Sequence, residues 1–187
     1  MKFNPVSYVV LGLIGLRGPS TPYQLKRSAG RSINYFWSFP HSQLYSEPKR
    51  LAAAGLLSEE VEEEGRRRKL YDLTEKGRTA LKQWLRTHPS EAFEMRDMAV
   101  LQLFFSDFME CQDLEELARK QVDVYCDRLE VYKEILEIRK GSQASDRRMA
   151  PLNLGFRLVE TCIEFWEEIA RNPPASEPAG SDKYGNS

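Results

Sequence analysis

The first half of the chain carries apolar residues at intervals of three and four, interrupted where helices commonly end. These intervals predict a helix over 5–17, with a proline in its first turn, and a second helix over 22–29. Thr21 precedes the second helix in a capping-box pattern. A third helix is predicted over 41–54, and Gly55 suits a left-handed cap at its C-terminal end. Three short helices are therefore expected in succession.

Alternating polar and apolar residues then predict a β-hairpin, with strands over 56–63 and 68–73 joined at a glycine turn. On the second strand Tyr71 and Leu73 share one face, as expected where one side of a hairpin packs on a core. Thr74 is placed to cap a fourth helix, which carries its apolar residues on one side. Three helices, a hairpin and a helix, in this order, predict a winged helix-turn-helix.

The second half is predicted to be helical throughout, so the fold class is mostly α with one small β-hairpin. Its first segment, 93–108, is a broad apolar stripe rich in phenylalanine. A capping signal at 113–116 opens a long helix that extends to about Lys140. We expect a winged helix-turn-helix domain over 1–89 and a helical dimerisation domain over 90–171.

Two stretches of the second half place apolar residues in alternating three- and four-residue steps, the spacing of a seam that packs against another helix. Packing within the chain's own helix bundle and a dimer interface both fit this spacing. We favour the dimer, because the seams are aromatic and long for the small half-domain available to cover them. The residues predicted at the interface are Val122, Tyr125, Leu129, Tyr132, Leu136, Leu152, Val159, Cys162 and Trp166. The tail, 172–187, is dominated by Pro, Ser, Gly and Ala and is predicted to be disordered.

Composition adds an asymmetry that the formal net charge of −1 hides. Residues 1–89 contain 15 Lys and Arg against 8 Asp and Glu, a net charge of +7. Residues 90–187 contain 12 against 20, a net charge of −8. A basic half joined to an acidic half indicates that only the first meets a polyanion, although chance scatter of surface charge would also produce such a difference.

The residue types that support catalysis or metal binding are not arranged for either. The two histidines, His41 and His88, lie outside any acid–base or metal-ligand pattern, and no phosphate loop or nucleophile elbow occurs. The three cysteines form no C-x-x-C pair, so neither a zinc site nor a disulfide framework is indicated. The apolar run 6–16 is too short to span a membrane and lacks a cleavage site. We therefore expect a cytoplasmic protein that is not an enzyme, with no catalytic residues, metal, cofactor or membrane association.

The start of the third helix carries side chains suited to reading bases in the major groove of DNA. Gln43 can pair bidentately with adenine, and Ser42 can reach a base or a phosphate. Tyr45 fits either a phosphate contact or burial against the first helix. For the cations further along, a solvated basic face is the alternative. The predicted DNA contacts of this helix are His41, Ser42, Gln43, Tyr45, Lys49 and Arg50.

The hairpin turn is followed directly by four consecutive cations, residues 66–69. Because like charges repel, a nearby polyanion is an economical explanation of this run. Five glutamates on the facing strand offer the alternative of cross-strand salt bridges. Alternate side chains point to opposite faces, so we expect some of the cations to be paired and those at the tip to be free. Arg66, Arg67 and Arg68 are predicted to contact DNA, the first two most directly.

Several stretches, taken in order, resemble the phenolic acid decarboxylase regulator (PadR) family. They cover most of 5–87 and are specific as an ordered set. The second half is similar to the helical dimerisation domain of the family's longer, virulence-activator-like branch, through Arg-Asp at 96–97, Leu-Phe-Phe at 103–105 and Leu-Gly at 154–155. The stretches of the first half are 10–13 (VLGL), 23–26 (YQLK), 40–45 (PHSQLY), 49–51 (KRL), 55–57 (GLL) and 65–78 (GRRRKLYDLTEKGR).

The resemblance implies a homodimeric transcriptional regulator, usually a repressor, that binds double-stranded DNA and is often released by a small molecule. Two-fold symmetry would then require an inverted-repeat operator. Trp84, Trp166, Tyr125 and Tyr132 are candidates to line an effector pocket, although such residues more often belong to a core. Pro48 departs from the family pattern, because it falls inside the third helix, which is then expected to be kinked or to start late. A winged-helix module that binds a protein instead of DNA is the alternative function.

Overall fold

The computed structural model of the chain describes residues 3–62, 67–90, 92–139 and 146–175. The chain divides into two compact units, an N-terminal unit that ends at Ala92 and a C-terminal unit that begins at Phe93. Predicted features at Arg66, and in the tail beyond residue 175, lie outside the described residues.

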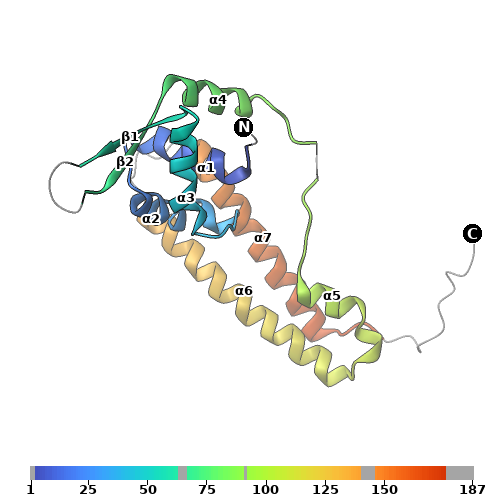
Figure 1. The fold of residues 1–187 in the computed structure, drawn as a ribbon. Helices are drawn as coiled ribbons and strands as arrows, with labels where there is room; N and C mark the ends of the chain where they lie inside the picture. The colour runs from blue at the N-terminus through green and yellow to red at the C-terminus, as the bar shows by residue number, and fades with distance from the viewer. Residues whose placement is uncertain (1–2, 63–66, 91, 140–145, 176–187) are drawn as a thin grey trace, which may run out of the picture. The chain divides into compact units, whose positions relative to one another are not determined.

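The predicted succession of three helices, hairpin and helix is confirmed in the N-terminal unit (Figure 1). Its elements are α1 (Pro5–Arg17), α2 (Pro22–Gly30), the 3-10 turn η1 (Ile33–Tyr35), α3 (Gln43–Ala53), β1 (Leu57–Val61), β2 (Lys69–Leu73) and α4 (Glu75–Leu85). The two strands pair antiparallel, with Leu57 opposite Leu73 and Val61 opposite Lys69. This is a winged helix-turn-helix in which β1 and β2 form the wing.

Local hydrogen bonds explain where α1, α2 and α4 begin. The Asn4 side chain accepts a hydrogen bond from the backbone N–H of Ser7 at 2.8 Å, and the Ser7 hydroxyl accepts one from the backbone N–H of Asn4 at 3.1 Å. Thr21 caps α2 in the same reciprocal way. Thr74 caps α4 by accepting from the third residue of that helix at 3.1 Å. These bonds satisfy backbone donors that every helix start leaves unpaired.

A single apolar core holds the N-terminal unit together. Every helix and both strands contribute to it, and α1 lies against α2, α3, α4 and β2. Ser20, between α1 and α2, forms a bridge with Tyr71 through two backbone hydrogen bonds of 2.9 and 3.0 Å, which ties this link to the hairpin. The largest core contributions come from Val10, Leu11 and Ile14 of α1, Leu25 of α2, Leu44 and Leu51 of α3, and Tyr71 of β2.

Two helices begin at other residues than the sequence pattern predicts. α3 begins at Gln43, because the backbone before it closes tight i→i+3 hydrogen bonds and the Ser42 side chain makes no capping bond. His41 and Ser42 therefore lie in the turn that precedes the helix. In the second half, the long helix begins at Cys111, so Asp113 lies within its first turn and is not its cap.

Pro48 is the sixth residue of α3, and the helix continues through it. The proline ring removes the N–H that would bond the carbonyl of Leu44. The ring is fully buried on the same face as Leu44 and Leu51. Burial of the ring in the core offsets part of the free energy lost with this hydrogen bond. The helix also starts later than the apolar pattern alone indicates, at Gln43.

Three stacked aromatic rings join the start of α1 to the end of α4. The ring centroids of Phe3 and Tyr8 are 5.2 Å apart, and those of Tyr8 and Trp84 are 4.4 Å apart with an interplanar angle of 9°. Such offset stacking adds to the energy of simple burial. The N-terminal segment is therefore fixed against the last turn of the winged domain.

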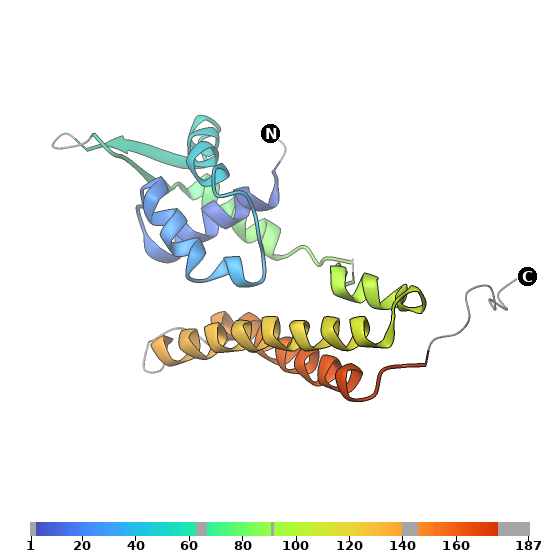
Figure 2. The ribbon, with the colours of Figure 1, turned by 90° about the horizontal axis from the view of Figure 1, so that it is seen from below.

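The C-terminal unit is helical, as predicted. Its elements are α5 (Met98–Phe104), the 3-10 turn η2 (Ser106–Phe108), α6 (Cys111–Arg139) and α7 (Asp146–Arg171). The helices α6 and α7 run side by side in opposite directions along most of their length (Figures 1 and 2). No helix within the described ranges is long and apolar enough to cross a membrane.

Close packing joins α6 to α7 and α5 to α6. A Cβ atom added to Gly155 would lie 2.7 Å from the hydroxyl of Tyr132, so only glycine permits this approach of the two long helices. Asp97 caps α5 by accepting from the N–H groups of Ala99 and Val100, and it also accepts a 2.6 Å hydrogen bond from the Tyr125 hydroxyl of α6.

The predicted seams lie largely between α6 and α7 of the same chain. Tyr132, Leu152, Val159 and Trp166 are buried there, so the chain itself covers these four side chains and none of them presents a surface to a partner. The other five residues predicted at the interface, which are Val122, Tyr125, Leu129, Leu136 and Cys162, are half-buried. The large apolar side chains that stay exposed in the first part of the unit are Phe93, Met95, Met98, Leu101, Phe104, Phe105 and Phe108.

Candidate nucleic-acid interface

One face of α3 is buried and the other is open to solvent. Tyr45 is half exposed, which excludes the alternative that it is buried against α1, and Lys49 is exposed on the same side. Gln43, at the first position of the helix, is half-buried, and Ser42 is exposed just before it. The structure therefore brings four of the predicted DNA contacts together at the N-terminal end and open face of α3.

His41 is held within the protein and does not point freely outward. Its Nε2 atom lies 3.0 Å from the side-chain amide of Asn34, and its ring packs at 6.1 Å from that of Phe39. Its Nδ1 atom and the Asn34 amide oxygen are buried and have no partner among the described residues. His41 thus joins the loop after α2 to the turn before α3.

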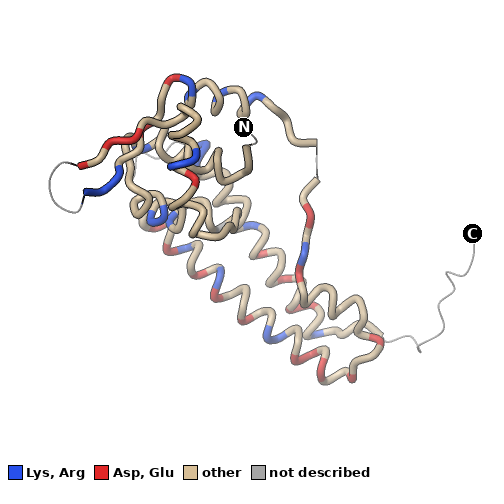
Figure 3. Tube along the Cα trace, in the orientation of Figure 1, with Lys and Arg blue, Asp and Glu red and all other residues tan. Residues whose placement is uncertain are grey.

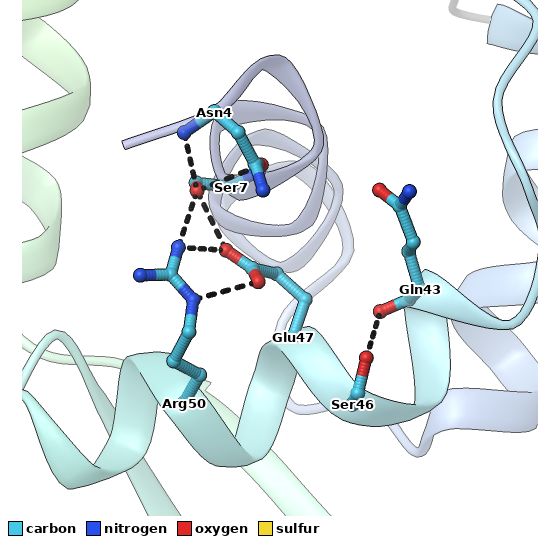
Figure 4. A network of polar contacts seen from close by, with 6 residues as sticks. All are labelled: Asn4, Ser7, Gln43, Ser46, Glu47 and Arg50. Carbon is cyan, nitrogen blue, oxygen red and sulfur yellow. Dashed lines mark hydrogen bonds and ion pairs between the residues drawn. The ribbon is translucent and has the colours of Figure 1, made fainter. Parts of the chain in front are cut away.

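A buried polar network connects α3 to α1 (Figure 4). Glu47, which is 6% exposed, accepts a 2.6 Å hydrogen bond from the Ser7 hydroxyl. The Arg50 guanidinium donates to both carboxylate oxygens of Glu47, at 2.9 and 2.5 Å, and to the Ser7 hydroxyl at 2.9 Å. Because Ser7 also bonds Asn4, the network fixes the recognition helix against the capped start of α1.

The electrostatics of this network favour the ionised pair. Burial raises the pKa of the Glu47 carboxyl, but the hydrogen bonds from Arg50 and Ser7 lower it by more, so the pKa lies below its ordinary value. The hydrogen bond to Glu47 raises the pKa of Arg50. Arg50, predicted to contact a phosphate, therefore has its guanidinium committed to an internal ion pair.

The sequence reasoning missed Ser7 and Glu47 as functional residues. The available signal was a carboxylate three residues before an arginine, at a position that shares the apolar face of α3. A charged residue on such a face is seldom buried without a partner, which points to an ion pair.

The hairpin pairs cations at and just before the start of β2 with carboxylates of β1 and of the residue that follows it. Lys69 donates to Glu59 at 2.5 Å, and Arg68 lies 3.2 Å from Glu62. Figure 3 shows the acidic residues along β1 and the basic residues at the start of β2. The interpretation that some wing cations are paired therefore holds for these two.

Arg67 differs from its neighbours. Its backbone has a φ of 47°, in the left-handed region that non-glycine residues seldom adopt, and its side chain is exposed. Within the described part of the chain, no hydrogen bond or ion pair involves Arg67. Its position beside the turn leaves its guanidinium open to solvent, whereas Arg66 lies outside the described residues.

Glu59 links the wing to the recognition helix. The hydrogen bond from Lys69, together with the charges of Lys69 and Lys49, lowers the pKa of the Glu59 carboxyl. Burial, followed by a hydrogen bond with Glu59, raises the pKa of Tyr71 to about 12. The cations of α3 and of the hairpin therefore lie in one electrostatic neighbourhood.

The aromatic residues considered for an effector pocket come from both units of the chain. Trp166 is buried in the C-terminal unit beside Tyr125, whereas Trp84 belongs to the stack of the N-terminal unit. Within the described ranges, no group of three or more His, Cys, Asp or Glu is placed to hold a metal ion.

Known proteins resemble this chain in sequence and in structure. Residues 10–83 match the transcriptional regulator PadR-like family. The negative transcriptional regulator PadR of Bacillus subtilis (strain 168) is 28% identical over 119 residues, which are 63% of this chain and 65% of that protein. The alignment therefore spans slightly less than two thirds of this relative.

Solved structures share the fold of the whole chain. Bacillus subtilis PadR in complex with operator DNA has a TM-score of 0.80 at 23% identity, covering 90% of this chain and 98% of that one. The Vibrio cholerae virulence activator AphA has a TM-score of 0.67 at 21% identity, covering 89% and 96%. These likenesses extend through α6 and α7, which shows that the helical unit is part of the shared architecture.

The sequence match begins within α1 and ends within α4, so it contains the complete α2, α3 and hairpin. These elements include the open face of α3 and the cations at and just before the start of β2. Through residues 10–83 the chain is similar to the PadR-like family of transcriptional regulators.

Proposed function

We propose that this protein is a sequence-specific regulator that binds double-stranded DNA through residues 1–89, acting in the cytoplasm without a cofactor. The observation that carries the proposal is that the open, polar face of α3 belongs to the same unit as a hairpin with cations at and just before the start of β2. A helix with exposed polar side chains at its start can enter the major groove, while a cationic wing contacts the flanking backbone.

Each predicted residue then has a distinct role. Gln43 and Ser42 read base edges, and Tyr45 and Lys49 bind phosphates beside them. Arg67 contacts the backbone from the hairpin together with Arg66, and Arg68 can do so by exchanging its partner Glu62 for a phosphate.

His41 and Arg50 position α3 from within the protein. His41 contacts Asn34, and Arg50 donates to Glu47 and Ser7, all within the N-terminal unit. This assignment replaces the direct DNA contact predicted for both from the sequence.

We propose the mode of regulation by analogy with the relatives. The Bacillus subtilis relative is described as a negative regulator, and structures of B. subtilis PadR hold operator DNA in one case and p-coumaric acid in another. We expect this chain likewise to repress transcription and to be released by a small molecule whose identity the site residues do not specify.

Dimerisation through residues 90–171 completes the proposal. Since the chain itself covers four seam residues, the contact involves the five half-buried ones and exposed apolar residues such as Phe104 and Phe108 of the stripe 93–108. Contiguous apolar surface of this kind marks protein interfaces. A two-fold dimer would read an inverted-repeat operator.

The test is salt-dependent binding of the full chain to a genomic fragment that the protein itself selects. Arg67→Glu should weaken binding to all sequences about equally, since phosphate contacts carry no base information. Gln43→Ala should instead relax preference at one or two base pairs, by roughly 1–3 kcal/mol for a lost bidentate contact. Lys82→Glu, an equal charge change at an exposed position of α4, is the control.

Two outcomes would contradict the assignment. A uniform loss of affinity in both variants would mean that Gln43 does not read bases. If no fragment bound at any salt concentration, the chain would be a winged-helix module for protein partners.

A further inference from the structure

An open pocket of about 310 Å³ lies in the N-terminal unit between the end of α1 and one side of α2. This volume is at the lower end of the range for small-ligand pockets. Its charged and polar lining consists of Arg17, Ser20, Gln24, Arg27, Ser28 and Arg31. The pocket was not anticipated from the sequence and contains none of the residues assigned above to base or phosphate contacts.

The described residues that line the pocket include three arginines and no carboxylate. Guanidinium groups are donors only and match phosphate oxygens in bidentate geometry. The side-chain oxygen of Gln24 is used by the backbone N–H of Thr21 at 2.8 Å, which leaves its amide nitrogen, a further donor, for a ligand. The pocket is thus complementary to an anion with several oxygens.

The arginines are not explained by helix stability alone. Arg17 is in the last turn of α1, and Arg27 is in the last turn of α2, where cations favour the helix dipole. Yet Arg17 and Arg27 come from different helices and line the same pocket. An anion bound in this pocket would explain why the two cations lie there together.

One residue of the pocket lining, Ser20, connects the pocket to the wing. Ser20 lines the pocket and forms the two-hydrogen-bond bridge with Tyr71. Tyr71 lies two residues from Lys69, the cation at the first position of β2. An anion seated in the pocket would therefore lie on the far side of β2 from the acidic strand β1.

We propose that this pocket binds a phosphate group through Arg17, Arg27 and the Gln24 amide. The phosphate can be a phosphodiester of DNA, in which case the inference rests on the proposed function and extends its footprint along α2. It can also belong to a free phosphorylated small molecule, in which case the pocket is an independent ligand site.

The first measurement is calorimetric titration of the full chain with inorganic phosphate at constant ionic strength, with chloride as the reference anion. The wild type should bind, and Arg27→Ala and Arg17→Ala should each weaken binding at least tenfold. Lys82→Ala, which removes an exposed cation outside the pocket, should bind as the wild type does.

The second measurement identifies the source of the phosphate. The logarithm of DNA affinity is followed against the logarithm of salt concentration for the same variants. If the pocket holds a backbone phosphate, Arg27→Ala should reduce the slope by about 0.9, the value for one lost contact, whereas Lys82→Ala should not. An unchanged slope with weakened phosphate binding assigns the pocket to a free ligand.

The inference is overturned if Arg17→Ala and Arg27→Ala change neither phosphate binding nor the salt slope relative to Lys82→Ala. If the wild type binds no DNA, the proposed function fails. The phosphate titration then tests the proposed pocket independently of DNA binding.

Discussion

At the scale of single residues, the recognition helix depends on one buried carboxylate. Glu47 accepts hydrogen bonds from Ser7 and Arg50, so it joins residues about 40 positions apart in the chain. Removing one partner of a buried pair leaves the other uncompensated, which costs more than the intact pair contributes. The orientation of α3 within the N-terminal unit is thus set by buried polar contacts with α1.

The pKa of Glu47 gives this network a pH dependence. Since the pKa is lower in the folded than in the unfolded chain, the ionised carboxylate stabilises the fold fully above its ordinary pKa of about 4.3. The contribution is lost as the pH falls through the lower folded value. Glu47→Gln should reduce the free energy of unfolding by about 1–3 kcal/mol at pH 7, and by less near pH 3.

Chemical denaturation at both pH values checks this, with Glu60→Gln on the exposed side of β1 as the control. An equal loss at pH 3 and pH 7 would show that the charge of Glu47 is irrelevant to its role.

At the scale of elements, what sequence could predict depended on the range of the interactions. The starts of α1, α2 and α4 were predictable because each cap bonds a residue three positions away. The start of α3 was not, since Ser42 makes no side-chain cap and a backbone turn sets the boundary instead. The Ser7–Glu47 contact joins distant segments, so no local pattern predicts it. The Arg-lined pocket lies between consecutive helices, but its shape depends on how they pack. The seam spacing of α6 and α7 predicted helix packing correctly but could not identify the partner helix.

Two glycines in helices should respond in opposite ways to substitution by alanine. A Cβ atom at Gly77 of α4 would lie 2.1 Å from the carbonyl oxygen of Leu56 and 2.9 Å from the Leu73 side chain, whereas one at Gly12 of α1 would meet nothing within 4 Å. Helix propensity alone favours alanine at both positions. Gly12→Ala should therefore stabilise the protein by about 0.5–1 kcal/mol. Gly77→Ala should destabilise it by about 1–3 kcal/mol or more, because the backbone must move.

Urea unfolding of the two variants and the wild type provides the measurement. Stabilisation by both substitutions would mean that α4 does not pack on the chain between α3 and β1 in the way described.

At the scale of the whole molecule, the two units have separate cores and opposite charge. The N-terminal unit buries most of its large apolar side chains, but the C-terminal unit leaves many exposed around α5. This surface is the part of the fold that gains most from a second copy of the chain.

The double substitution Phe104→Asp and Phe108→Asp should therefore dissociate the proposed dimer. Both side chains are nearly four-fifths exposed, so their replacement leaves the core intact. Sedimentation should show a monomer with unchanged helix content, and DNA affinity should fall with it. Leu85→Asp, at an exposed apolar residue of α4, is the matched control. A variant that still sediments as a dimer would place the contact elsewhere on α6 or α7.

The stack of Phe3, Tyr8 and Trp84 gives the molecule a built-in optical probe. The three tryptophans lie in three different places: Trp37 in the exposed loop before α3, Trp84 in the stack and Trp166 in the helical core. Rings held rigidly in contact produce near-ultraviolet circular dichroism, which vanishes once packing loosens. Trp84 should therefore dominate that spectrum in the N-terminal unit, and the emission of Trp166 should be the most blue-shifted. Events at the chain's exit from the winged domain and in the helical unit can thus be followed separately, without any attached label.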